Sequence, residues 1–307
     1  MNILVTGGAG FIGSHVADAY LNAGHRVLVL DDLSSGIKEN VPRGAAFFQV
    51  DIRDDAAMAE IFRGHSINVV NHHAAQMDVR KSVEDPVFDA SVNIIGSLIL
   101  LELCLKHGVR KFIFASTGGA IYGEQERFPA DEQHPMRPLS PYGIAKLAVE
   151  RYLNYYGQVH GIRYASLRYG NVYGPRQNPN GEAGVVSIFA NKMLRGEQSI
   201  IHGDGHQTRD YVYVGDVVRA NLLALEYSGS DAFNVGSGVE TDVNTVFQKL
   251  KSLTNASRAE KHGPPKKGEQ LRSVLSYQKI RSMLGWSPDV SIDEGFRRTV
   301  AFFSQKR

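Results

Sequence analysis

A tyrosine and a lysine four residues apart, Tyr142 and Lys146, are the residues of this chain best placed to move a proton. On a helix, this spacing puts both side chains on one face, about one turn apart. A lysine ammonium near a phenol favours the phenolate and so lowers the tyrosine pKa. A free tyrosine titrates near pH ~10, so a base poised near pH ~7 needs about 4 kcal/mol of differential stabilisation. Two solvated residues on a helix would show the same spacing, so the surrounding elements must decide.

A glycine-rich loop near the N-terminus predicts a dinucleotide site. Gly7, Gly10 and Gly13 lie between a predicted buried strand, 2–6, and a predicted helix, 14–24. A tight turn that brings the backbone close to a pyrophosphate needs residues without Cβ, and the helix N-terminus favours the anion. A tight turn without a ligand is the alternative, which the strand and helix context disfavours.

Two aspartates identify the dinucleotide. Asp31 and Asp32 follow a second predicted strand, 26–30, and Asp31 comes 18 residues after Gly13. An acid at this distance binds the ribose hydroxyls of the adenosine. A 2′-phosphate would meet two carboxylates here, and no Arg or Lys follows before Lys38. The pattern therefore favours NAD over NADP.

The alternation of strands and helices continues along the chain and predicts an α/β fold. Further strands are expected at 46–50, 67–70 and 111–115, and further helices at 55–63 and 87–107. Repeated β-α-β units form a doubly wound (Rossmann) parallel sheet, and ligands bind at the carboxyl ends of its strands. Each motif named above ends such a strand or follows one.

Composition excludes several classes of protein. A formal net charge of +2 argues against a nucleic-acid or membrane surface. The single cysteine, Cys104, excludes a disulfide framework and lies in an apolar run typical of a core. We see no signal peptide and no apolar run of about 18 residues, so a cytoplasmic protein is expected. The eleven histidines show no metal-ligand spacing, so no metal is expected.

Six segments together resemble the extended short-chain dehydrogenases/reductases, and among them the UDP-hexose 4-epimerase branch. The resemblance covers nearly the whole chain, and it rests on Thr6–His15, Asp31–Gly36, Ala115–Gly123, Pro141–Lys146, Leu167–Pro175 and Arg209–Asp216. The resemblance implies that Tyr142 is the general base on the sugar hydroxyl. It also implies that Lys146 lowers the pKa of Tyr142 and holds the nicotinamide ribose.

The resemblance also implies a third catalytic group, a serine or threonine hydroxyl, but its usual position holds Gly118 here. Thr117 is the preferred replacement and Ser116 the second. A site with no hydroxyl partner, in which both residues satisfy local backbone groups, stays open.

The residues after this position distinguish related reactions. Nucleotide-sugar dehydratases carry an Asp-Glu pair there, whereas this chain has Gly118, Gly119 and Ala120. Without an acid for elimination, the resemblance implies reversible 4-epimerisation of UDP-hexoses through a transient 4-keto intermediate. A UDP-uronate epimerase or an NAD-dependent dehydrogenase of the same family is the alternative.

The resemblance implies a set of NAD-binding residues. They are Gly7, Gly10, Phe11, Ile12, Gly13, Asp31, Asp32, Asp51, Ile52, Ala74, Ala75, Asn93, Tyr142 and Lys146. Asp51 is the candidate partner of the adenine amino group, although a solvated loop acid is an equal alternative.

The resemblance implies a second set for the UDP-sugar. Its members are Asn171, Val185, Val186, Arg209, Lys266, Glu269, Arg272 and Ser273. Arg209 suits a diphosphate, with an ion pair to Asp210 as the alternative. Ser273 takes the place of a bulky residue that would exclude N-acetyl sugars, so both UDP-Glc/UDP-Gal and UDP-GlcNAc/UDP-GalNAc are expected to fit.

The same resemblance implies the domain organisation and the assembly. An NAD-binding domain is expected at 1–170 with a return segment at about 211–236. A smaller C-terminal α/β substrate lobe is expected at 171–210 and 237–307. A homodimer is expected through the helix that carries Lys146 and the helix at 87–107.

Overall fold

A computed structural model describes residues 1–179, 184–265 and 270–305, so the predicted ligands Lys266 and Glu269 lie outside the described residues. The chain forms two compact units. Unit 1 comprises Met1–Ile121, Pro138–Arg168 and Val218–Phe233. Unit 2 comprises Tyr122–Arg137, Tyr169–Val217 and Asn234–Arg307.

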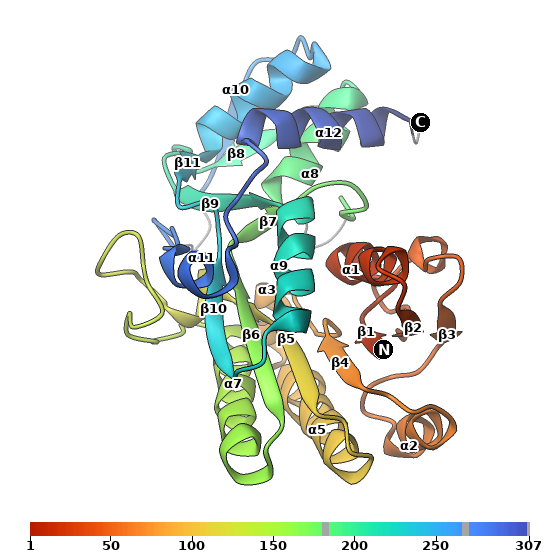
Figure 1. The fold of residues 1–307 in the computed structure, drawn as a ribbon. Helices are drawn as coiled ribbons and strands as arrows, with labels where there is room; N and C mark the ends of the chain where they lie inside the picture. Colours follow the sequence, from red (N-terminus) through yellow and green to blue (C-terminus); the bar gives the residue numbers. More distant parts are fainter. Residues whose placement is uncertain (180–183, 266–269, 306–307) are drawn as a thin grey trace. The chain divides into compact units, whose positions relative to one another are not determined.

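A seven-stranded sheet dominates the described part of the chain (Figure 1). Its order is β10-β6-β5-β4-β1-β2-β3, and the pairs from β5 to β3 are all parallel. The strands are β1 (Asn2–Thr6), β2 (Arg26–Leu30), β3 (Ala46–Phe48), β4 (Val69–His72), β5 (Lys111–Thr117), β6 (Arg163–Tyr169) and β10 (Asp231–Val235). The predicted doubly wound α/β fold is confirmed.

Helices cover both faces of this sheet. They are α1 (Phe11–Asn22), α2 (Asp55–Gly64), α3 (Val79–Glu84), α4 (Pro86–Ala90), α5 (Gly96–Lys106), α6 (Gly118–Ile121), α7 (Pro141–His160) and α9 (Val214–Glu226), with the 3₁₀ turn η1 (Lys38–Asn40) and the π-helical turn η2 (Ser91–Ile95). On one face, Tyr20 of α1 donates to the backbone of Asn221 on α9, and Asn71 of β4 donates to both side chains. This polar contact ties α1 and α9 to the centre of the sheet.

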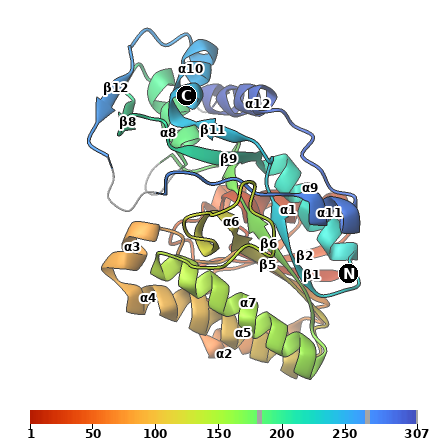
Figure 2. The ribbon, with the colours of Figure 1, turned by 90° about the vertical axis from the view of Figure 1, so that its left-hand side faces the viewer.

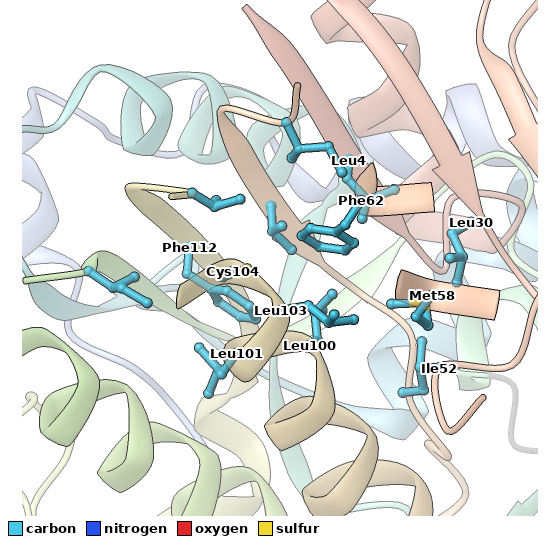
Figure 3. Close-up of a cluster of buried hydrophobic side chains, with 14 of the residues drawn as sticks. Leu4, Leu30, Ile52, Met58, Phe62, Leu100, Leu101, Leu103, Cys104 and Phe112 are labelled. Atoms are coloured by element: carbon cyan, nitrogen blue, oxygen red, sulfur yellow. The ribbon is translucent and has the colours of Figure 1, made fainter. Parts of the chain in front are cut away.

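The opposite face carries the main hydrophobic core of unit 1 (Figure 3). Met58 and Phe62 of α2, Leu100 of α5 and Leu153 of α7 pack there against alternate strand residues such as Phe112. Figures 1 and 2 both show α5 and α7 side by side along this face. Cys104 is fully buried within the same cluster, as its apolar surroundings predicted.

The helical run across α4, η2 and α5 corrects one expectation. Pro86–Lys106 is a continuous helical stretch of 21 residues, and an 18-residue window within it has a mean hydropathy of 1.8, long and apolar enough to cross a membrane. The expectation of no such run was wrong, because small and polar residues between the leucines mask its length. Its inner face packs in the core of unit 1, as in many core helices of water-soluble proteins, so length and composition alone are weak evidence for a membrane span.

Unit 2 contains smaller sheets and a helical layer. Its remaining elements are β7 (Asn171–Tyr173), α8 (Val185–Leu194), β8 (Ile200–His202), β9 (Thr208–Tyr213), β11 (Glu240–Asp242), α10 (Val243–Thr254), β12 (Lys261–Gly263), α11 (Gln278–Leu284) and α12 (Ile292–Gln305). The strands pair as β11-β9-β7 and β12-β8, and α8, α10 and α12 pack against one another. Asp210 organises this unit: its buried carboxylate accepts hydrogen bonds from the backbone of Ser237, Gly238 and Leu275.

Candidate active site

The predicted tyrosine and lysine both lie at the start of α7. The helix begins there because the Ser140 side chain accepts from the Gly143 amide at 3.2 Å and Pro141 occupies the first turn. Gly161, in the left-handed region at φ +73°, ends it. Tyr142 is half-buried and Lys146, one turn later, is 4% exposed. The close approach of α7 to α6 needs Gly143, since a Cβ there would lie 2.8 Å from the Ala120 oxygen.

Lys146 is held between α7 and the end of β5. Its Nζ donates to the Ala115 carbonyl at 2.9 Å and lies 4.7 Å from the centre of the Phe114 ring. Burial lowers the pKa of Lys146 to about 8, and the carboxylates of Asp89 and Glu150 oppose that shift. The ammonium is therefore fixed in position and close to its titration range.

Tyr142 departs from the expectation that its partner would lower its pKa. Burial raises the pKa of Tyr142 well above its ordinary value of 10.0, and the charge of Asp89 adds to this. The Lys146 Nζ lies 5.8 Å from the centre of the phenol ring while it is bonded to the Ala115 carbonyl. Desolvation of the phenol thus outweighs the attraction of the ammonium.

The two candidate hydroxyls at the end of β5 have different surroundings. Ser116 is buried, and its Oγ donates to Glu150 Oε1 at 2.6 Å. Glu150 also forms a buried ion pair with Arg168 of β6, with 2.6 Å between Nη2 and Oε2. Thr117 is half-buried at the last position of the strand. The geometry assigns Ser116 to this internal network and leaves Thr117 as the better candidate for a substrate.

The glycine loop has the shape that a pyrophosphate requires. A Cβ on Gly13 would lie 2.3 Å from the Gly7 oxygen, and one on Gly7 would lie 2.6 Å from the Ala74 nitrogen. Gly7 also has φ +66°, which favours glycine. Gly10 caps α1, and Phe11 and Ile12 open its first turn half-buried. Backbone amides at this helix N-terminus fit an anion, and the loop leaves no room for a side chain.

The acids predicted for the adenosine occupy different environments. Asp31 is buried, accepts from the Ala9 amide at 3.0 Å and the Leu33 amide at 2.9 Å, and burial raises its pKa. It therefore joins the second strand to the glycine loop, where a ribose would lie. Asp32 accepts from Ser34 and caps a surface turn. Asp51 forms a bidentate ion pair with Arg53, and this pair lowers the pKa of Asp51. The carboxylate that was predicted to bind the adenine amino group is therefore already paired within the chain.

The remaining predicted NAD residues lie in the loops after β3 and β4 and in η2. Ala74 donates its amide to the Thr6 hydroxyl at 3.2 Å, and Ala75 follows it half-buried. Ile52 is buried against Gly96, where a Cβ would lie 2.7 Å from its side chain. Asn93 is also buried, and its amide bonds to the backbone of the loop after β4. Ile52 and Asn93 therefore shape the site from within the fold.

His72 and His73 behave as core residues. His72 bridges the hydroxyls of Thr6 at 2.7 Å and Ser97 at 2.9 Å. Burial lowers the pKa of His73 to about 3 and that of His72 well below its ordinary value, so both are neutral. Within the described ranges, no group of three His, Cys, Asp or Glu side chains could hold a metal.

Unit 2 carries the residues predicted for the UDP-sugar. Asn171 begins β7, half-buried and paired with Tyr211. Val185 is half-buried at the first position of α8, whereas Val186 is 1% exposed and belongs to the core. Arg209 on β9 donates to the Thr208 carbonyl.

Two further predicted ligands lie near each other in sequence but differ in exposure. Arg272 is exposed, pairs with Glu240 at 2.7 Å and stacks over the Phe128 ring at 3.7 Å. Ser273 is 2% exposed. The Arg272 guanidinium is thus already engaged within unit 2, and Ser273 sits inside the fold.

Sequence reasoning missed four residues around the candidate pair: Asp89 and Glu150, whose charges act on Lys146, and their partners Gln76 and Arg168. The signal for Glu150 was present, because it follows Lys146 by one helical turn. Asp89 likewise precedes Asn93 by four residues. Nothing in the sequence marks Arg168 or Gln76 as their partners, because these contacts join separate elements.

The fold and this site define an extended dehydrogenase/reductase class, and comparison with known proteins agrees. Residues 3–236 match the NAD dependent epimerase/dehydratase family. The chain belongs to this family. It is 43% identical over 312 residues to a UDP-glucose 4-epimerase of Mycolicibacterium smegmatis, covering 100% of this chain and 99% of that protein.

Two solved structures are similar over nearly the whole chain. A UDP-glucose 4-epimerase of Thermotoga maritima, crystallised with UDP-glucose, has a TM-score of 0.98 and 53% identity, covering 100% of this chain and 99% of that one. A UDP-glucose 4-epimerase of Thermus thermophilus in complex with NAD has a TM-score of 0.95 and 48% identity, covering 99% of both chains.

Proposed function

We propose that this protein is an NAD-dependent UDP-hexose 4-epimerase. The observation that carries the proposal is the Tyr142 and Lys146 pair at the start of α7, beside a strand end followed by Gly118, Gly119 and Ala120 rather than by acids. The similarity to epimerases crystallised with UDP-glucose and with NAD supports it.

Each residue of the site has a role in this reaction. The glycine loop and Asp31 would hold NAD. When bound, NAD would supply a nicotinamide ring that accepts the hydride and returns it, and the positive charge of that ring would favour the phenolate. Tyr142 takes the proton of the sugar 4-hydroxyl as the 4-keto sugar forms, and gives it back when the other face is reduced. Thr117 donates a hydrogen bond to the same oxygen, and Lys146 holds its ammonium near the phenol. No net oxidation occurs, so no free NADH is expected.

Several finer statements are part of the same proposal. In unit 2, Asn171, Val185 and Arg209 contact the nucleotide, and Lys266, Glu269 and Arg272 remain candidates beside the diphosphate. The small Ser273 admits UDP-GlcNAc and UDP-GalNAc together with UDP-Glc and UDP-Gal. We also propose that the protein acts in the cytoplasm as a homodimer.

Exposed apolar side chains on unit 1 support the homodimer. Val83 of α3, Val87 of α4, Ile95 of η2, and Tyr155 and Val159 of α7 are all exposed. Their helices pack against one another in one layer (Figure 2). A layer of apolar residues on adjoining helices is a common subunit interface.

The test is to incubate the purified protein with each UDP-sugar, without added NAD, and to resolve the products by chromatography. We expect interconversion at C4, and a loss of roughly 10²–10⁴-fold in kcat for Tyr142→Phe, which removes the proton-transfer group. Tyr152→Phe is the matched control, since Tyr152 is exposed on the same helix, and it should keep full activity. Full activity of Tyr142→Phe, or stoichiometric release of NADH, would overturn the proposal.

A further inference from the structure

We propose that Asp89 is a positioning residue of the catalytic pair. It fixes the loop after β4 through Asn93 and Gln76, and it is the buried counter-charge of the Lys146 ammonium. This inference rests on the proposed function to the extent that Tyr142 and Lys146 form the catalytic pair.

Asp89 is a buried carboxylate bonded to neutral groups. It is 1% exposed at the C-terminal half of α4. Its Oδ1 accepts from Gln76 Nε2 and from Asn93 Nδ2, both at 2.9 Å. Neither amide carries a charge, so these bonds leave the negative charge of Asp89 uncompensated. A buried charge is costly unless another charge is paired with it.

The same two amides fix the loop between β4 and α3. Asn93 donates to the Gln76 carbonyl and accepts from the Gln76 amide, both at 2.9 Å. The Gln76 side chain in turn donates to the Asp78 carbonyl and accepts from its amide. Asp89 thus completes a set of bonds that holds the backbone just after Ala74 and Ala75, the predicted NAD residues.

Lys146 is a buried cation on the neighbouring helix, α7. Helix α4 packs against α7, and the charge of Asp89 is the larger of the two carboxylate effects on the pKa of Lys146. The other is Glu150 on α7, whose charge is neutralised by its ion pair with Arg168. The Lys146 charge also acts on His72, the last residue of β4, and on His73, which follows it. Both are neutral because burial lowers their pKa values.

The arrangement has opposite effects on the two catalytic groups. The charge of Asp89 favours the Lys146 ammonium, which burial alone would discharge, and it disfavours the Tyr142 phenolate. Without that charge, the pKa values of both groups should fall. A purely structural role, confined to the hydrogen bonds of Oδ1, would leave both pKa values unchanged.

Asp89→Asn tests the two roles separately, because asparagine keeps the acceptor oxygen and removes the charge. The Lys146 titration, followed by carbon-13 NMR of labelled lysine and assigned with Lys146→Arg, should move to lower pH by about one unit. Both limbs of the pH profile of kcat/KM should also move to lower pH. Asp85→Asn is the matched control: Asp85 is exposed, caps the same helix, and is replaced by an equally good cap. An unmoved Lys146 titration would overturn the proposal.

A reciprocal measurement covers the case in which Asp89→Asn fails to fold. Coupling between two sites is equal in both directions, so Lys146→Met should raise the pKa of Asp89 by a similar amount, measured by carbon-13 NMR of its carboxyl. An unchanged Asp89 titration would contradict the proposal. These titrations need no turnover, so their failure differs from the failure of the proposed epimerase function, which an inactive wild type would reveal.

Discussion

At the scale of single residues, spacing predicted a candidate base and its lysine but not the groups that surround them. Tyr142 and Lys146 stand out because one helical turn joins them, a relation that the sequence contains. The choice between Ser116 and Thr117 depends on Glu150 and Arg168, which come from other elements. The raised pKa of Tyr142 likewise depends on burial and on Asp89, which no local pattern shows.

The division of work between the two hydroxyls gives a residue-scale prediction. Thr117→Val removes the hydroxyl assigned to the sugar oxygen, and kcat should fall roughly 10²–10³-fold with little change in stability. Ser116→Ala instead removes the bond to Glu150, so unfolding should become easier by about 1 kcal/mol while kcat changes less. Steady-state kinetics and urea unfolding of both variants separate the roles. The opposite ranking of the two kcat values would assign the catalytic hydroxyl to Ser116.

At the scale of elements, short buried strands and glycine loops were the easiest features to predict. The expected bounds of the first two strands agree with β1 and β2, because apolar runs end there at Gly7 and at Asp31. Helix α1 begins three residues before its expected start, since Gly10 serves as its cap. Side-chain roles within elements were harder to predict: Val186, expected near a ligand, is a core residue of α8.

The glycine loop gives an element-scale prediction. Gly13→Ala places a Cβ 2.3 Å from the Gly7 oxygen, so the turn must open. We expect a loss of about 1–3 kcal/mol in unfolding free energy. We also expect NAD to copurify with the wild type and to be lost from the variant. Urea unfolding and the nucleotide content of the denatured protein measure the two effects.

Gly64→Ala is the control for this variant. Gly64 ends α2 with nothing within 4 Å of a built Cβ, so alanine there should be neutral or slightly stabilising. Equal behaviour of the two alanine variants would show that close packing at Gly13 does not shape the loop.

At the scale of the whole molecule, the alternation of strands and helices predicted the doubly wound parallel sheet, since parallel strands need crossover helices. It predicted five of the seven strands, β1 to β5, and missed β6 and β10. The division into compact units was harder, because it depends on distant contacts. The segment Tyr122–Arg137 follows β5 in sequence yet belongs to unit 2. There the Asn234 side chain accepts from the Tyr122 hydroxyl and donates to the Ala130 carbonyl. These contacts span more than 100 residues, so no window of sequence contains them.

Assembly gives the last prediction, because the proposed homodimer would bury the exposed apolar layer of unit 1. Val159 is 59% exposed on α7, one turn after the exposed Tyr155. Val159→Glu would place a charge in the interface of the proposed homodimer, where desolvation without a counter-charge is costly. Sedimentation equilibrium should show a dimer for the wild type and a monomer for the variant at the same micromolar concentration.

Val239→Glu is the matched control, because Val239 is 60% exposed in unit 2, outside this layer, and its charge should leave the dimer intact. A Val159→Glu variant that is as dimeric as the control would place the interface elsewhere. A wild type that sediments as a monomer would contradict the homodimer.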